Sequence, residues 1–223
     1  MAISDLAAGA LSITLADETL TLLSQRAVWW AAQNTLFVAD LHFGKEATFR
    51  EAAIPIPDQT AQNLKRLTSA INATQAKRLV ILGDLIHARS GRCEKTFALI
   101  SEWRRTHAEL KIDLVRGNHD DSAGDPPSEW HMNCASEPQT MSPFQLRHHP
   151  KCVPGQFVLA GHLHPTVRLS GPARDSMKLP CFLLRDDVLN FPAFSSFVDG
   201  AAIRPRLGDG VFGICGDDVI QLQ

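Results

Sequence analysis

The chain has 223 residues, of which 44% are hydrophobic and 21% charged, and its net charge is −2. This composition is typical of a globular protein with a sizeable core, and it excludes a collagen-like chain and a small secreted scaffold. The near-neutral charge shows no global basic field of the kind that marks many nucleic-acid-binding proteins. We expect one domain over residues 1–223.

The sequence indicates neither a membrane segment nor secretion. No apolar run reaches the roughly 18 residues of a membrane span, and the start of the chain lacks the basic flank and apolar stretch of a signal peptide. The five cysteines are scattered without a C-x-x-C pair, which predicts buried reduced thiols rather than disulfides or a zinc cluster. We therefore expect a cytoplasmic protein.

The first two thirds of the chain alternate between strand and helix patterns. Residues 11–28 predict a strand pair around a polar turn, and Trp29 and Trp30 are expected to pack in the core rather than stack on bases. Three short apolar runs, residues 36–39, 79–82 and 157–160, predict strands buried on both faces, and residues 112–115 predict another short strand. A helix is predicted to open at Pro57-Asp58, with apolar residues at helical spacing up to Ile71, and another over residues 94–107.

The rest of the chain is predicted to be surface loop and β-structure. Residues 121–144, rich in proline and poor in apolar pairs, predict an excursion over the surface. Antiparallel strands are predicted at residues 179–184, 188–191 and 211–222. Since strand and helix alternate first and β-structure follows, the predicted fold is a layered α/β sandwich.

Each of these four short strands leads into side chains that can bind metal. The four clusters are Asp40-Leu41-His42, Gly83-Asp84-Leu85-Ile86-His87, Gly117-Asn118-His119-Asp120 and Gly161-His162-Leu163-His164. Because sites in open α/β sheets lie beyond the carboxyl ends of the strands, we expect the clusters to converge on one crevice. The glycine before Asp84, Asn118 and His162 would let the backbone turn sharply where each strand ends.

The donor types indicate a reactive metal site. Imidazole with carboxylate suits Mn, Fe or Zn in an open site, whereas closed structural zinc sites favour thiolates, and no cysteine lies near these motifs. The ligands suffice for two ions, and two ions about 3.5–4 Å apart are the usual arrangement for in-line displacement at phosphorus. Asp84 is expected to bridge them, since it follows a central strand.

These motifs, with an H-x-P segment at His148, resemble in type and order the calcineurin-like metallophosphoesterase superfamily over residues 36–165. The resemblance implies a four-layer αββα metallophosphoesterase sandwich. It implies two metal groups that share Asp84: Asp40, His42, Asp84 and His164 for one ion, and Asp84, Asn118, His148 and His162 for the other. It also implies that metal-bound hydroxide attacks phosphorus, that His119 donates a proton to the leaving oxygen, and that Asp120 orients the His119 imidazole.

Three further segments, FVADLHFGKEATFREAAIPIP, GDLIHAR and FPAF followed by VFGICGDDVI, resemble the bacterial ligase-associated DNA damage response phosphoesterases. That resemblance implies a Mn-dependent phosphodiesterase or endonuclease acting on DNA, beside a DNA ligase and a helicase; the charge balance does not itself indicate DNA. The chain departs from this branch at Ser195, where glycine is usual.

Several residues near the motifs keep more than one interpretation. The H-x-P spacing selects His148 over His149 as a metal ligand. His87 either supports Asp84, contacts phosphate or is an ordinary loop residue, and Arg89 and Arg92 either clamp phosphate or belong to a solvated loop. A local basic rim or ordinary surface is predicted for Lys45, Arg50, Arg116, Arg147, Lys151 and Arg168.

Two other functions compete with DNA hydrolysis. A phosphatase or phosphodiesterase for a small metabolite or nucleotide would be favoured if residues 121–144 closed a pocket, whereas an open groove would favour DNA. A non-catalytic repair scaffold is the second alternative, and the intact Asn118-His119-Asp120 segment argues against it. The native metal, endo- or exonucleolytic cleavage, and the oligomeric state are not determined by the sequence.

Overall fold

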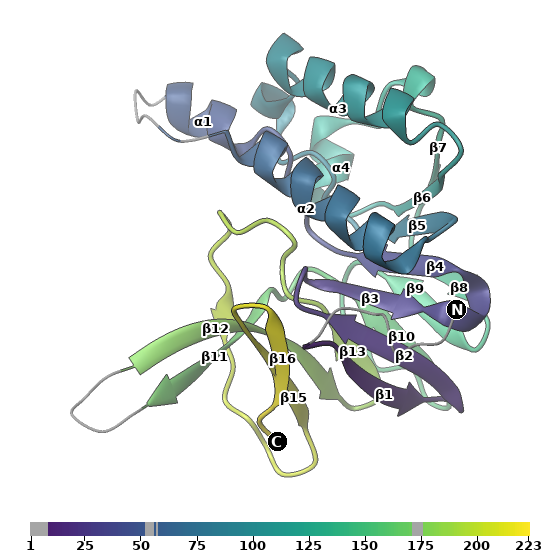
Figure 1. The fold of residues 1–223 in the computed structure, drawn as a ribbon, viewed down its shortest axis with the longest axis vertical. Coiled ribbons are helices and arrows are strands. Elements are labelled where there is room, and N and C mark those ends of the chain that lie inside the picture. The colour runs from purple at the N-terminus through teal and green to yellow at the C-terminus, as the bar shows by residue number, and fades with distance from the viewer. Residues whose placement is uncertain (1–8, 52–55, 57, 171–175) are drawn as a thin grey trace.

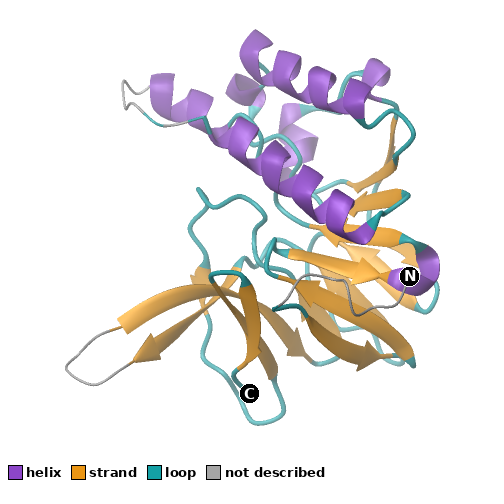
Figure 2. Ribbon diagram, in the orientation of Figure 1, coloured by secondary structure: helices purple, strands orange, loops and turns teal. Residues whose placement is uncertain are grey.

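Two β-sheets pack face to face, and helices cover one of them (Figures 1 and 2). The computed structural model describes residues 9–51, 56, 58–170 and 176–223. Within these residues, no helix is long and apolar enough to cross a membrane.

The first sheet has seven strands in sequence order, which are β1 (Leu11–Leu15), β2 (Glu18–Leu23), β3 (Ala27–Trp30), β4 (Thr35–Val38), β5 (Arg78–Ile81), β6 (Lys111–Val115) and β7 (Met132–Ala135). The first four strands form an antiparallel meander, and β4 to β7 are parallel. The parallel strands β4, β5 and β6 lie between two apolar layers, as their apolar residues predicted.

The second sheet follows the order β14-β11-β12-β13-β10-β9-β8, with β15 attached to β12 and β16 to β15. The strands are β8 (Gln139–Met141), β9 (Phe144–Arg147), β10 (Phe157–Ala160), β11 (Pro165–Ser170), β12 (Ser176–Arg185), β13 (Val188–Asn190), β14 (Ala201–Ala202), β15 (Gly210–Cys215) and β16 (Asp218–Gln221). At its centre, β9, β10 and β13 are parallel, so their carboxyl ends point the same way.

The helices are α1 (Lys45–Glu51), α2 (Gln59–Thr74), α3 (Glu94–Thr106) and α4 (Asn118–Ala123), with short 3₁₀ turns η2 (Ala31–Gln33), η3 (Arg89–Gly91) and η4 (Ser128–Trp130). Asp58 caps α2, since its side chain accepts a hydrogen bond of 3.1 Å from the Ala61 N–H. Leu64 and Leu67 on α2 and Ile100 on α3 face the first sheet. The predicted helix starts were therefore close, although Pro57 lies outside the described residues.

Two large apolar clusters hold the layers together. One lies between the helices and the first sheet, and the other lies between the two sheets around Trp30, Phe37 and Phe182. Trp29 and Trp30 are 5% and 0% exposed, which confirms that they pack in the core. The expected helical layer on the outer side of the second sheet is not formed by the described helices, and small apolar clusters of strand residues lie there instead.

Two predictions about the chain's surface hold only in part. Residues 121–144 lie largely at the surface, as predicted, but they are not an irregular excursion: they include β7, which extends the first sheet, and Trp130, which is fully buried beside Phe97. An edge strand needs few apolar residues, so its pattern resembles that of a loop. All five cysteines are free, but only Cys181 is buried, and Cys152 and Cys215 are exposed.

Candidate metal centre

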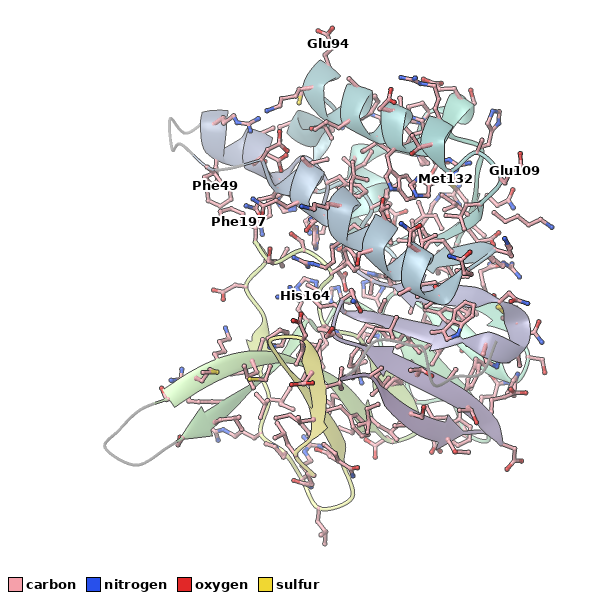
Figure 3. The ribbon with its side chains drawn as sticks, viewed as in Figure 1. Phe49, Glu94, Glu109, Met132, His164 and Phe197 are labelled. Carbon is pink, nitrogen blue, oxygen red and sulfur yellow. The ribbon has the colours of Figure 1, made fainter. Side chains whose placement is uncertain are left out.

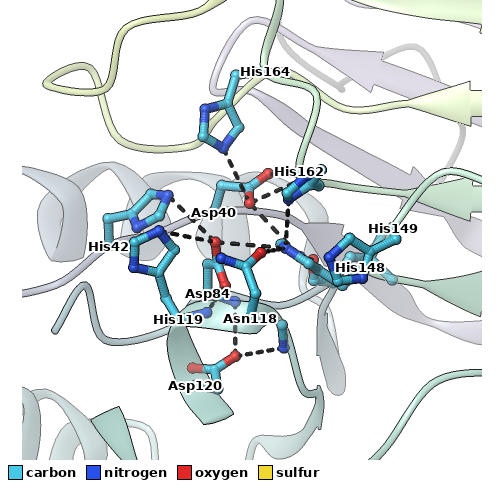
Figure 4. Close-up of polar contacts among 12 residues, drawn as sticks. Asp40, His42, Asp84, Asn118, His119, Asp120, His148, His149, His162 and His164 are labelled. Atoms are coloured by element: carbon cyan, nitrogen blue, oxygen red, sulfur yellow. Dashed lines mark hydrogen bonds and ion pairs between the residues drawn. The ribbon is translucent and has the colours of Figure 1, made fainter. Parts of the chain in front are cut away.

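Seven of the side chains expected to bind metal lie together where strands from both sheets end (Figure 4). Asp40 and His42 follow β4, Asp84 follows β5, Asn118 begins α4 after β6, His148 follows β9, and His162 and His164 follow β10. The first three strands belong to the first sheet and the last two to the second. The crevice thus lies where the two sheets meet, not at the edge of one open sheet as the sequence suggested.

Two buried carboxylates form the centre of the cluster. Asp40 is 0% and Asp84 2% exposed. Asp84 Oδ2 lies 3.7 Å from His42 Nε2 and 3.5 Å from His148 Nε2, and Asp40 Oδ1 lies 3.2 Å from His164 Nε2. Burial raises the pKa of Asp84; His148 opposes this and Asp40 adds to it. A cation at this position would offset the repulsion between the two carboxylates.

Ring nitrogens and an amide oxygen gather beside the carboxylates. His148 Nδ1 lies 3.0 Å from the Leu82 carbonyl oxygen. Since a carbonyl only accepts, Nδ1 carries a proton, and Nε2 points into the cluster, 3.0 Å from Asn118 Oδ1 and 3.1 Å from His162 Nδ1. Three such atoms so close together are the donor set that a bound cation needs.

His42 gives a second test of whether the residues fit a metal ion. Its Nε2 is buried and makes no hydrogen bond to any described residue, which is a costly state for a polar atom. Burial, with His164 and His119 nearby, holds the pKa of His42 well below its usual range. The ring is therefore neutral at pH 7, as a metal ligand must be.

The backbone of the cluster is strained. Left-handed φ angles, uncommon outside glycine, occur at Asp40 (58°), His42 (46°), Asp84 (55°), His162 (66°) and His164 (47°). Such strain persists only where the surroundings impose it, and it gathers at functional sites.

The glycines before the motifs act differently from the prediction. Only Gly83 takes a positive φ, at 86°. A Cβ at Gly117 would lie 2.3 Å from Asp84 Oδ1, and one at Gly161 would lie 2.6 Å from the Leu82 carbonyl oxygen. These two glycines are needed because the cluster packs against their backbone, and the sharp turns fall on the Asp and His residues themselves.

His119 lies at the open side of the cluster. Its Nδ1 lies 2.5 Å from the His87 carbonyl oxygen, so Nδ1 donates, and its Nε2 lies 3.9 Å from Asp84 Oδ2. The side chain is 34% exposed. The ring nitrogen that faces the site is therefore Nε2.

Asp120 does not orient the His119 ring, so that expectation is wrong. Its carboxylate accepts three backbone hydrogen bonds, from Asp84 N at 2.8 Å, Leu85 N at 2.9 Å and Gly117 N at 2.9 Å. Asp120 thus ties together the turns that follow β5 and β6. Burial raises the pKa of Asp120 to about 6.

His87 joins the cluster, whereas Arg89 and Arg92 hold other parts of the chain. His87 Nδ1 lies 3.2 Å from His42 Nδ1, and burial lowers the pKa of His87 to about 4. Arg89 donates to the Ser122 carbonyl at 3.1 Å, and Arg92 to the carbonyls of Gly124 and Asp125 at 3.0 and 2.8 Å. These contacts hold the end of α4 and the residues after it, so both arginines have partners within the chain and do not support a phosphate clamp.

The His148-His149 pair is separated by burial. His148 is 0% exposed and faces the carboxylates, whereas the His149 side chain is 46% exposed and its Nδ1 lies 2.8 Å from Glu137 Oε1. Glu137 Oε2 also accepts from the backbone N–H of both histidines, at 2.7 and 2.9 Å. Sequence reasoning missed Glu137, since nothing in its neighbourhood distinguishes it from a surface glutamate.

Only part of the expected basic rim lies free beside the cluster. Lys45 follows His42 and its charge lowers the pKa of both His42 and His87. Arg116 is held in a bidentate ion pair with Asp125, at 2.7 and 2.8 Å. Because Asp125 balances its charge, Arg116 adds little positive potential beside the cluster.

Residues 34–158 match the family model of the calcineurin-like phosphoesterases. The chain belongs to this family. A solved structure of Pseudomonas putida nuclease MPE is similar to it, with a TM-score of 0.84 and 35% identity, covering 96% of this chain and 100% of that one. YfcE, a phosphoesterase from E. coli, aligns with a TM-score of 0.42 and 17% identity, covering 84% of this chain and 97% of that one. No curated protein matches the chain.

Family membership and the His/Asp cluster together identify the protein as a metal-dependent phosphoesterase. The α/β fold with two mixed sheets is likewise confirmed. These findings argue against the non-catalytic scaffold.

Proposed function

We propose that this phosphoesterase is a dinuclear DNA nuclease. The observation that carries the proposal is its 35% identity to a nuclease over 96% of its length. The exposure of Asn118 and His162 supports it, because an open site accommodates a polymer. Residues 121–144 extend the first sheet rather than closing a pocket, which weighs against a small-metabolite phosphatase.

In the proposed site, Asp40, His42, Asp84 and His164 would hold one ion, and Asp84, Asn118, His148 and His162 would hold the other. The position of Asp84 Oδ2 between His42 Nε2 and His148 Nε2, at 3.7 and 3.5 Å, supports its bridging role. When bound, two divalent ions supply Lewis acidity at phosphorus and activate the nucleophile. Mn²⁺ is proposed from the resemblance described above, and Fe and Zn suit the same donors.

The chain's own groups do the remaining chemistry. With its Nδ1–H donating to the His87 carbonyl, the doubly protonated His119 ring would carry a second proton on Nε2 for the departing oxygen. Asp120 fixes the backbone of Asp84 and Gly117, so it positions rather than protonates. His87 lies against His42 and His119 and is proposed to support their ring positions.

The wider biological assignments rest on the branch resemblance. We propose that residues 1–223 form one domain, since one apolar cluster joins the two sheets. We also propose a cytoplasmic location and action beside a DNA ligase and a helicase.

The deciding experiment uses protein that is stripped with a chelator and reloaded with Mn²⁺. We expect hydrolysis of bis-p-nitrophenyl phosphate in preference to p-nitrophenyl phosphate, and nicking of circular single-stranded DNA. Both activities should disappear in Asp84→Asn. Turnover of the monoester with inert DNA would instead assign the protein to small-molecule phosphatases.

A further inference from the structure

Two aromatic side chains lie outside the core and contact each other. Phe49 on α1 and Phe197 in the loop after β13 pack edge to face, with ring centroids 5.0 Å apart and an interplanar angle of 75° (Figure 3). Both are half-buried, and neither belongs to the apolar clusters of the described residues. Each therefore keeps part of its ring available to another molecule.

Phe49 is connected to the metal centre through α1. The Lys45 N–H donates to the His42 carbonyl at 3.2 Å, so α1 begins directly beside that residue. Phe49 lies four positions after Lys45, which places both side chains on one face of the helix, about 6 Å apart along its axis. The face that carries Phe49 is thus the face that carries Lys45, whose charge acts on His42 and His87.

Phe197 is connected to the same side of the centre through Ser195. The Ser195 N–H donates to the Asp40 carbonyl at 3.2 Å, and the Ser195 hydroxyl accepts from the Phe197 N–H at 3.3 Å. Two residues later, the Asp199 carbonyl lies 3.5 Å from His164 Nδ1. Phe197 therefore sits between two backbone contacts to residues of the proposed first ion.

We propose that Phe49 and Phe197 form a platform on which an unpaired nucleobase next to the cleaved phosphodiester stacks. Aromatic rings bind bases by their faces, regardless of sequence. A base inside a duplex has its faces covered by neighbouring pairs, so the platform selects single-stranded or unpaired DNA. Lys45 on the same helix face provides a cation for an adjacent phosphate. This inference rests on the proposed nuclease function and specifies its substrate.

The test compares substrates that share a leaving group and differ in whether they carry a nucleoside: thymidine 3′- and 5′-p-nitrophenyl phosphate against methyl p-nitrophenyl phosphate. Phe49→Leu and Phe197→Leu keep apolar volume and remove the ring. We expect kcat/KM to fall roughly tenfold for at least one thymidine ester and to change less than twofold for the methyl ester. Phe49→Tyr and Phe197→Tyr should retain most of the activity.

Phe97→Leu is the matched control, because Phe97 is another half-buried ring in an edge contact, 5.0 Å from Trp130 on the helical side. It should affect the thymidine and methyl esters equally. Equal losses on both esters in the Phe49 and Phe197 variants, or no loss on either, would overturn the platform.

Single-stranded DNA then separates this inference from the nuclease proposal. If wild-type protein fails to cut DNA, the proposed function is wrong. If wild-type protein cuts single-stranded DNA and the two leucine variants cut it equally well, the platform alone is wrong.

Discussion

The roles of single residues follow from which atoms face the cluster. Asp84 is almost completely buried and lies between His42 and His148, whereas His119 lies at the open side and is one-third exposed. The first position suits charge that holds metal, and the second suits proton transfer to a substrate. Substitutions at the two positions should therefore have different consequences.

We predict that Asp84→Asn abolishes turnover and most metal binding, because it removes the charge shared by both ions. His119→Ala should keep its metal and lose about 10²–10⁴-fold in rate, as expected for a lost general acid. The loss should be smallest with p-nitrophenyl leaving groups, which need no proton. Metal analysis beside kinetics checks this, and an equally low metal content in both variants would contradict it.

Asp120→Ala is predicted to act through the backbone rather than through His119. The substitution leaves three N–H groups without their acceptor, at about 1–3 kcal/mol for each one that stays unsatisfied. We expect a lower unfolding temperature and weaker metal binding, measured by thermal unfolding and Mn²⁺ titration. Normal metal affinity with a rate loss like that of His119→Ala would restore the orienting role.

At the scale of elements, the metal centre depends on a segment that contains none of its proposed ligands. Residues 193–196 follow β13, and their backbone N–H groups donate to the Ala39 and Asp40 carbonyls. Arg26, between β2 and β3, donates to the carbonyls of Ala193 and Ser195 at 3.0 and 2.9 Å. Burial, with Arg66 nearby, lowers the pKa of Arg26 to about 10, so it stays charged at pH 7.

We predict that Arg26→Gln loosens this segment and, through it, Asp40. Hydrogen bonds from a charged donor contribute about 1.5–3 kcal/mol, so the free energy of unfolding should fall by about that amount, with weaker Mn²⁺ binding. Arg105→Gln is the matched control, because Arg105 pairs only with exposed Glu102 and should change stability by less than about 1 kcal/mol. Unchanged metal affinity in Arg26→Gln would contradict the clamp.

The turn before β15 carries a pH-dependent contribution to stability. Asp209 is nearly buried and accepts from Arg185 Nε at 2.9 Å and from the Arg206 N–H at 2.8 Å. Arg185 holds the pKa of Asp209 below its ordinary value, so the carboxylate stabilises the fold at neutral pH. That contribution is lost as pH falls through the ordinary value near 4 toward the lowered one.

We therefore predict that Asp209→Asn lowers stability at pH 7 and that its difference from wild type shrinks below about pH 4. Urea unfolding of both proteins at several pH values measures this difference. A difference that stays constant, or grows as pH falls, would be inconsistent with a lowered pKa.

At the scale of the whole molecule, the centre lies between two sheets that contribute different ligands. Metal binding should therefore stabilise the global fold and not only the loops. We predict that Mn²⁺ raises the unfolding temperature of chelator-treated protein. At a concentration of 100 Kd, the free energy of unfolding should rise by about 2.7 kcal/mol. Asp84→Asn should show little increase. Calorimetry with and without Mn²⁺ tests this, and a rise of equal size in the variant would place the stabilising ion elsewhere.

Much of the framework was predictable because burial leaves a local pattern. The strands β4, β5, β6 and β10 are rich in apolar residues, and the ligand-type residues follow each of them within a few positions. The site's residue types and their order therefore follow from the sequence. An edge strand such as β7 needs fewer apolar residues, so the same reasoning placed it on the surface.

The partners of polar groups were decided only by the tertiary structure. Arg26 meets the Ala193 carbonyl 167 positions away, and Glu137 meets His148 from a different strand connection. Asp120 follows His119 directly yet bonds the turn of Asp84, 36 positions away. Periodicity records which side chains are buried, because burial repeats along an element. A hydrogen bond depends on where two distant segments finally meet, and no local pattern encodes that.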